Sequence, residues 1–159
     1  MSKRAASAQA DELRGLMQQL FRRFGALTAD STPCGMALSM AHAHALMVTR
    51  ARGELSQREL GAELRIDKSN VARLCARMVD AGHAEQRPCV DDGRSRRVSL
   101  TERGQRLARE VEAASAARFG ALLGALPAGR RDAVLDALQH LVTALDLMPA
   151  VSSQERSSA

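Results

Sequence analysis

Aromatic residues are scarce in this sequence, which contains three phenylalanines and no tryptophan or tyrosine. Stacking platforms for single-stranded nucleic acid and sugar-binding clefts depend on such rings, so both kinds of site are disfavoured. Hydrophobic residues still make up 45% of the 159 residues. The chain is therefore long and apolar enough for one domain, or for one core with appended helices, and that core must be aliphatic.

Long apolar segments are also missing from the sequence. There is no run of 18 apolar residues and no apolar signal region near the N-terminus. We therefore expect a cytoplasmic protein without a membrane span. The formal net charge of +5 favours an anionic partner without specifying which one.

The residue types that support common catalytic and metal sites are not arranged for them. The three cysteines, Cys34, Cys75 and Cys89, are an odd number and show no CxxC spacing, which argues against a disulfide framework or a four-cysteine zinc site. No Ser-His-Asp set, carboxylate pair or phosphate-binding loop is evident. We expect neither catalysis nor a cofactor.

Apolar periodicity predicts helices towards both ends of the chain. In residues 10–29 and again after Pro127, apolar residues alternate at spacings of four and three, which places them along one side of a helix. A monomer of this size cannot cover both apolar seams, so the pattern suggests a dimer. The seams consist of Leu13, Met17, Leu20, Phe24 and Leu27, and of Val134, Leu138, Leu141, Leu145 and Met148.

Helix caps define three further helices in the middle of the chain. Ser39 is suited to cap a helix that runs to Arg52, where Gly53 supplies a left-handed stop. Residues 56–64 begin with a capping box, in which Ser56 and Glu59 each accept a backbone hydrogen bond from the other.

The third of these helices follows after a short turn. Asp67 caps it and Gly82 ends it. Its buried stripe is predicted to contain Val71, Leu74, Cys75 and Met78, and Cys75 is then a small core residue.

A two-stranded ribbon follows directly. Residues 84–90 form its first strand, which Pro88 confines to an edge of the sheet, and residues 96–100 form the second. The stretch "DDGRS" is the turn between them, and Thr101 then caps a long helix that runs to about Gly124.

A short capped helix, a tight turn and a second helix with polar outer residues make a helix-turn-helix, and the ribbon after it is a wing. Polar side chains at the start of the second helix point to DNA contact, because Asn pairs with adenine N6 and N7 and Arg with guanine O6 and N7. The predicted DNA-contacting residues of the two helices are Ser56, Gln57, Lys68, Ser69, Asn70, Arg73 and Arg77.

These elements, in this order, resemble the MarR family of winged helix-turn-helix regulators. The resemblance covers roughly residues 10–148, and its most specific parts are "GELSQRELGAEL", "DKSNVARL" and "DDGRSRRVSLTERG". The last of these fits the family's wing pattern at Asp92, Arg94, Ser95, Val98, Leu100, Thr101 and Gly104.

The resemblance implies a homodimer that binds a pseudopalindromic operator on double-stranded DNA. It also implies that Arg94, braced by Asp92, enters the minor groove, where a guanidinium suits a narrow A·T-rich groove. Arg96 and Arg97 alternate across the ribbon, so we expect only one of them to reach phosphate. We expect a repressor that a small molecule releases.

The chain departs from the family pattern at three positions. Arg65 stands in the turn where Gly is frequent, and a left-handed arginine there would cost on the order of 1 kcal/mol. Asn70 replaces a common Thr, and His83 replaces a large apolar residue at the start of the wing.

The expected fold is mainly α with a small β-wing, flanked by N- and C-terminal dimerisation helices. We expect residues 1–8 and the tail 149–159 to be disordered and 9–148 to form the MarR-like domain. Within it, residues 37–101 form the winged helix-turn-helix, and 10–29 and 102–148 the dimerisation helices.

The stretch "CGMALSMAHAHALM" is compatible with more than one function. One hypothesis is an effector pocket lined by Met40, His42, His44 and Met47. An alternative is a redox- or metal-responsive regulator that uses Cys34, His42 and His44, although the two histidines lie about 200° apart around a helix and cannot both face one ion. A third hypothesis is a helical interaction protein that does not bind DNA.

Overall fold

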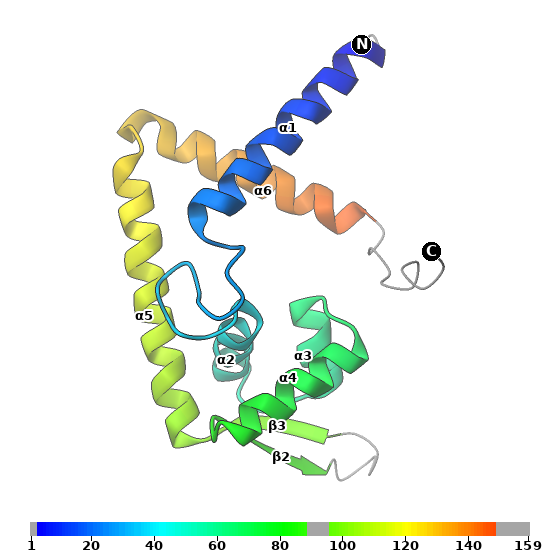
Figure 1. The fold of residues 1–159 in the computed structure, drawn as a ribbon, viewed down its shortest axis with the longest axis vertical. Helices are drawn as coiled ribbons and strands as arrows, with labels where there is room; N and C mark the ends of the chain where they lie inside the picture. Colours follow the sequence, from blue (N-terminus) through cyan, green and yellow to red (C-terminus); the bar gives the residue numbers. More distant parts are fainter. Residues whose placement is uncertain (1–2, 89–95, 149–159) are drawn as a thin grey trace. The chain divides into compact units, whose positions relative to one another are not determined.

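The computed structural model describes residues 3–88 and 96–148, and Figure 1 draws the fold. Within these ranges the chain is mostly helical, with a three-stranded antiparallel sheet. In chain order the elements are α1 (Lys3–Phe24), α2 (Met40–Arg52), β1 (Leu55–Ser56), α3 (Gln57–Leu64), α4 (Lys68–Asp80), β2 (Ala84–Pro88), β3 (Arg96–Leu100), α5 (Glu102–Ala125), the short 3-10 helix η1 (Ala128–Arg130) and α6 (Arg131–Leu147).

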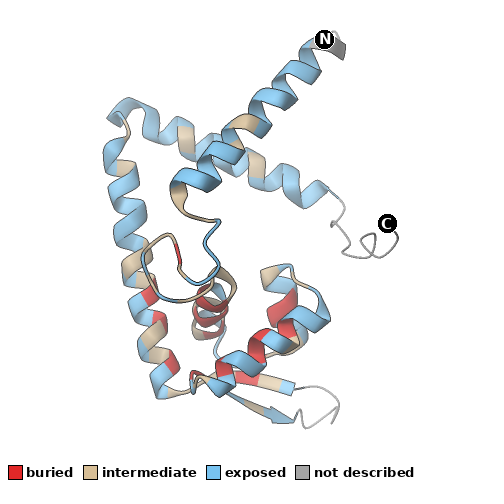
Figure 2. Ribbon diagram, viewed as in Figure 1, coloured by how far each residue is buried: buried red, intermediate tan, exposed pale blue. Residues whose placement is uncertain are grey.

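The chain divides into two compact units, Met1–Arg118 and Phe119–Ala159. The first unit contains the sheet, and most of its buried side chains come from α2, α3, α4, the sheet and the first half of α5 (Figure 2). In the second unit no residue of α6 is buried, and α6 is described over its full length.

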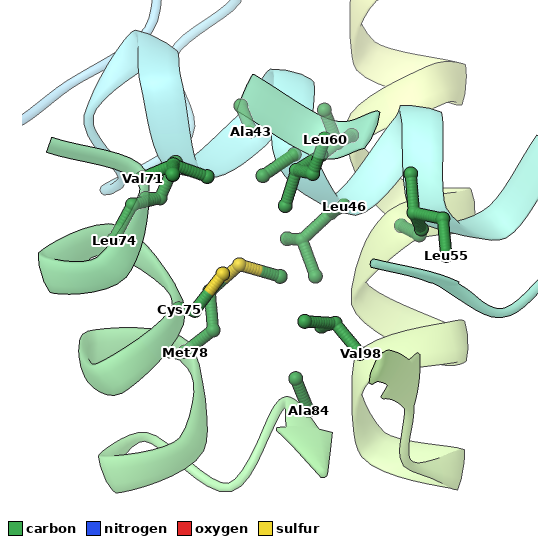
Figure 3. Close-up of a cluster of buried hydrophobic side chains, with 13 residues drawn as sticks. Ala43, Leu46, Leu55, Leu60, Val71, Leu74, Cys75, Met78, Ala84 and Val98 are labelled. Carbon is green, nitrogen blue, oxygen red and sulfur yellow. The ribbon is translucent and has the colours of Figure 1, made fainter. Parts of the chain in front are cut away.

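An aliphatic core holds the first unit together, as the sequence predicts. Leu46, Leu60 and Leu74 are at most 1% exposed and come from three different helices, and Figure 3 shows them gathered with Met78 and Val98. Each buried Leu stabilises the fold by about 1.5–3 kcal/mol, so this cluster fixes the three helices against the sheet.

The wing lies beside the core as an antiparallel ribbon. Strands β2 and β3 pair from Ala84 with Leu100 to Pro88 with Arg96. The sheet order is β1-β3-β2, so Pro88 lies on an edge strand, where its missing N–H is tolerated. The sequence did not predict β1, which adds a third strand by pairing Leu55 with Val98.

The first helix differs from its predicted range. Helix α1 begins at Lys3, so the expected disordered lead is helical from that residue, and it ends at Phe24 rather than near Ala29. Gly25 adopts a left-handed φ of 83°, which stops the helix even though the apolar seam continues to Leu27.

Across residues 3–88 and 96–148, no helix is both long and apolar enough to cross a membrane.

Candidate nucleic-acid interface

Helix α4 has two chemically distinct faces. Val71, Leu74, Cys75 and Met78 are buried, as predicted, and hold the helix against the core. The other face is exposed and mainly polar or basic. It carries Lys68, Ser69, Asn70, Arg73 and Arg77, which are the predicted DNA-contacting residues of this helix.

Asp67 caps α4 and organises its first turn. Its carboxylate accepts hydrogen bonds from the Asn70 backbone N–H and the Ser69 hydroxyl, both at 2.8 Å. These two hydrogen bonds, the backbone one first, lower the pKa of the Asp67 carboxyl. The cap therefore remains an ionised acceptor at neutral pH.

The side chains of Asn70 and Arg73 are already connected to this cap. Asn70 Nδ2 donates to Asp67 Oδ2 at 2.5 Å, and Arg73 Nη2 donates to Asn70 Oδ1 at 2.5 Å. The spacing of three residues places the three side chains in sequence along one strip of the helix.

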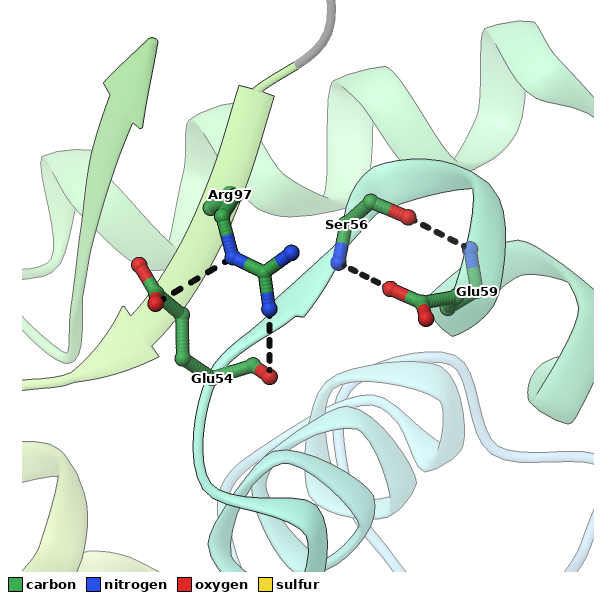
Figure 4. A network of polar contacts seen from close by, with 4 residues as sticks. All are labelled: Glu54, Ser56, Glu59 and Arg97. Atoms are coloured by element: carbon green, nitrogen blue, oxygen red, sulfur yellow. Dashed lines mark hydrogen bonds and ion pairs between the residues drawn. The ribbon is translucent and has the colours of Figure 1, made fainter. Parts of the chain in front are cut away.

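Helix α3 begins with the predicted capping box. The Ser56 backbone N–H donates to Glu59 Oε2 at 2.6 Å, and the Glu59 backbone N–H donates to Ser56 Oγ at 3.1 Å (Figure 4). Hydrogen bonding from Ser56, first from its backbone N–H and then from its side chain, lowers the pKa of Glu59. The Ser56 hydroxyl, a predicted DNA contact, is thus also part of the fold, while the adjacent Gln57 is half-buried.

The turn between α3 and α4 is left-handed at Arg65, with φ 53° and ψ 42°. The Arg65 backbone N–H donates to the carbonyls of Ala62 and Gly61 and so closes α3. This conformation is the one in which a non-glycine residue is strained.

The two wing arginines of β3 have different surroundings. Arg97 is half-buried, and its Nη2 donates to the Glu54 carbonyl at 3.1 Å while its Nε lies 3.2 Å from the Glu54 carboxylate (Figure 4). Arg97 therefore joins the wing to the segment before β1, whereas Arg96 is exposed. The two other wing residues singled out from the sequence, Asp92 and Arg94, lie outside the described residues.

His42 of α2 contacts His83, the residue directly before β2. The sequence did not predict this contact. His42 Nε2 and His83 Nδ1 share a hydrogen bond of 3.1 Å, and both residues are buried. Burial is the main cause that lowers the pKa of each ring. For His42 the charges of His83 and Arg77 add to this effect, and for His83 that of Arg103 does.

The residues of the hypothesised effector pocket differ in their burial and contacts. His42 is directed to His83, and its backbone N–H donates to the Ser39 cap at 3.3 Å. His44 is exposed, and Met40 and Met47 are half-buried.

The cysteines that the structure describes also differ. Cys75 is fully buried, and burial raises the pKa of its thiol to about 11, which makes it unreactive at neutral pH. Cys34 is half-buried, with its Sγ 2.9 Å from the Thr32 hydroxyl. Within residues 3–88 and 96–148, no three His, Cys, Asp or Glu residues are grouped so that they could hold a metal ion.

The arrangement of α3, a tight turn, α4 and the β2–β3 ribbon defines a winged helix-turn-helix protein. The model of the MarR family matches residues 38–95, which include α3, α4 and β2. This part of the chain is therefore similar to the MarR family, whose members are transcriptional regulators, and the resemblance found in the sequence is confirmed.

Solved structures extend the similarity of fold to most of the chain. A probable transcriptional regulator from Pseudomonas aeruginosa has a TM-score of 0.71 at 23% identity, over 84% of this chain and 98% of that one. A mutant MarR from E. coli complexed with operator DNA has a TM-score of 0.67 at 22% identity, over 84% and 95%.

A third similar structure concerns regulation by a small molecule. BpsR of Bordetella bronchiseptica, described with a mechanism for regulation of its DNA binding by 6-hydroxynicotinic acid, has a TM-score of 0.68 at 19% identity, over 82% of this chain and 98% of that one. No curated protein sequence matches the chain.

Proposed function

We propose that this protein is a homodimeric, sequence-specific DNA-binding transcriptional regulator. The observation that carries the proposal is the exposed strip Lys68–Ser69–Asn70–Arg73 at the N-terminal end of α4, whose opposite face is fixed in the core. A helix that presents hydrogen-bonding and basic side chains from a rigid support is suited to the major groove. As such a regulator, the protein would act in the cytoplasm and would need neither catalysis nor a cofactor.

The homodimer is proposed from apolar surface that the chain does not cover. Helix α6 exposes Leu138 at 45% and Leu145 at 56%, and α1 exposes Leu13 and Leu20 at 45% each. A second copy of the chain would bury these seams. The two α4 helices, one from each subunit, would be the recognition helices. At a separation of about 34 Å they would meet successive major grooves of a pseudopalindromic operator.

Repression released by a small ligand is the proposed mode of control. The regulation of BpsR by 6-hydroxynicotinic acid supports it by similarity of fold. A ligand beside α2 would change the separation of the two recognition helices and so the population able to bind DNA. The proposed ligand pocket is lined by Met40, His44 and Met47. His42 would contact the ligand only if its hydrogen bond to His83 were broken.

A fluorescence-anisotropy titration of genomic fragments and of random DNA, at several salt concentrations, tests the proposal. We expect tight binding to a subset of fragments, with log affinity falling by roughly 0.9 per phosphate contact for each tenfold increase in salt. Equal affinity for all fragments, or none, would favour a helical interaction protein instead.

The wing is tested in the same titration. Arg94→Ala should weaken operator binding and reduce the salt slope, because a guanidinium in the minor groove is lost from both subunits. The matched control is Arg109→Ala on the exposed face of α5. If the two variants bind alike at every salt concentration, the wing is not a DNA contact.

A further inference from the structure

The side-chain amide of Asn70 has a defined orientation. Its Nδ2 faces the Asp67 carboxylate and its Oδ1 faces the Arg73 guanidinium, each at 2.5 Å. An ionised carboxylate only accepts hydrogen bonds and a guanidinium only donates them. The reversed amide would place oxygen against oxygen and donor against donor, so the chemistry of the two partners fixes the assignment.

This orientation changes the role that Asn70 can have on DNA. An asparagine that reads adenine must offer its oxygen to N6 and its NH₂ to N7 at the same time. In this structure both ends of the amide already have partners within α4 and its cap. Asn70 would have to turn away from Asp67 and Arg73 to make the bidentate contact.

The same contacts organise Arg73. One Nη2 hydrogen bond holds the guanidinium to an amide that the Asp67 cap holds in turn, so part of its rotational freedom is lost before DNA binds. The guanidinium has five N–H donors, and those not used by Asn70 can face the O6 and N7 acceptors of guanine. Arg73 is exposed, so its side chain is open to such a contact.

We infer that Asn70 is a positioning residue that sets the Arg73 guanidinium for guanine, and that it does not itself read adenine. Asp67 anchors this triad as well as capping the helix. The inference rests on the proposed DNA-binding function and specifies which base α4 selects.

A double-mutant cycle tests the inference on the operator obtained by selection from random DNA. Arg73→Ala should lower affinity by roughly 5- to 150-fold and relax a guanine position in each half-site. Asn70→Ala should relax the same position. In the Arg73→Ala background, Asn70→Ala should change affinity less than about twofold, because the group that it positions is absent. Additive losses, or a second relaxed position that prefers adenine, would overturn the inference.

An exchange of the residues at positions 67 and 70 provides a matched variant. Asp67→Asn combined with Asn70→Asp reverses the donor and acceptor between them, keeps a good helix cap and still offers Arg73 an oxygen. Overall affinity should fall because a carboxylate moves toward the DNA, yet the guanine preference should persist. Loss of that preference, with the helix content of the protein unchanged, would contradict the positioning role.

A measurement without DNA separates this inference from the proposed function. In the free protein, Arg73→Ala and Asp67→Ser should each shift the NMR signals of the Asn70 side-chain amide, and Arg77→Ala should not. Unshifted signals would refute the triad even if the protein binds its operator. Shifted signals in a protein that selects no DNA sequence would instead contradict the proposed function, and with it the role in guanine recognition.

Discussion

Gly104 illustrates at the scale of one residue why the wing pattern ends in glycine. A Cβ at this position would lie 1.9 Å from the His83 carbonyl oxygen. The same carbonyl accepts the Thr101 backbone N–H at 3.1 Å, and the Thr101 hydroxyl donates to Gly82 at 2.7 Å while accepting the Gly104 N–H at 3.1 Å. The first turn of α5 therefore approaches the start of the wing too closely for any side chain.

Gly104→Ala should destabilise the fold by roughly 1–3 kcal/mol, because the added methyl group must displace backbone. Gly120→Ala in the same helix is the matched control, since a Cβ at that position would meet nothing within 4 Å. It should be neutral or stabilise by up to about 1 kcal/mol. Urea unfolding measures both, and similar unfolding free energies for the two variants would contradict the close approach.

The buried histidine pair predicts how stability depends on pH. The pKa of both rings is lowered in the folded protein from an ordinary value of 6.5. Below about pH 6.5 the unfolded chain therefore binds protons that the folded chain does not. Stability should be complete above this pH and should fall as the pH decreases towards the lowered folded pKa values.

Urea unfolding at pH 7.5 and pH 5.5 tests this dependence. The double variant His42→Leu with His83→Leu removes both titrating groups and should lose less stability on acidification than the wild type. His140→Ala, at an exposed position of α6, should lose as much stability between pH 7.5 and pH 5.5 as the wild type. An equal loss in the double variant would place the acid sensitivity elsewhere.

At the scale of the element, the helix starts could be predicted because their signals are local. Ser39, Ser56 and Asp67 each cap the next residues in sequence, and the structure confirms all three. The beginning of α1 was missed because Lys3–Ala10 has no apolar periodicity, although alanine and lysine favour helix by propensity.

Long-range contacts explain the other differences between sequence and structure. Strand β1 has only two residues and exists through its pairing with β3. Arg97 reaches Glu54 across 43 positions, and His42 reaches His83 across 41. Nothing in the sequence near these residues specifies such a partner, so the candidate DNA face of α4 was predictable while the contacts that support the wing were not.

The left-handed turn at Arg65 gives a prediction for the helix-turn-helix element. Arg65→Gly should preserve the turn and raise stability by up to about 1 kcal/mol, because glycine adopts this conformation without steric cost. Ala62→Gly, three residues earlier in α3, should cost about 1 kcal/mol, since there the glycine stands inside a helix. Thermal unfolding compares them, and an Arg65→Gly loss as large as that of Ala62→Gly would disprove strain at the turn.

For the whole molecule, the distribution of burial distinguishes a well-packed core from apolar surface that remains exposed. The first unit buries side chains from several helices and the sheet, whereas α6 buries none along its full length. The four-three spacing predicted which side of α6 is apolar. It could not specify the partner, because periodicity describes one helix and an interface needs two.

The dimer therefore provides the prediction that tests the whole assembly. Leu145 is 56% exposed within the chain, so Leu145→Asp should leave the first unit folded. If a second copy covers this seam, two carboxylates replace two buried leucines, each of which contributes about 1.5–3 kcal/mol. Sedimentation should then show monomers at concentrations where the wild type is dimeric. Operator affinity should fall as well, since each half-site is bound without the gain from linkage.

Thr143→Asp is the matched control, because Thr143 lies about 200° around α6 from both Leu141 and Leu145 and is exposed. It introduces the same charge into the same helix but outside the apolar seam, so it should leave the dimer and operator binding intact. A stable dimer for Leu145→Asp would mean that α6 does not form the interface. Monomers for both variants would show that any charge on α6 is disruptive, and the seam itself would then not be the cause.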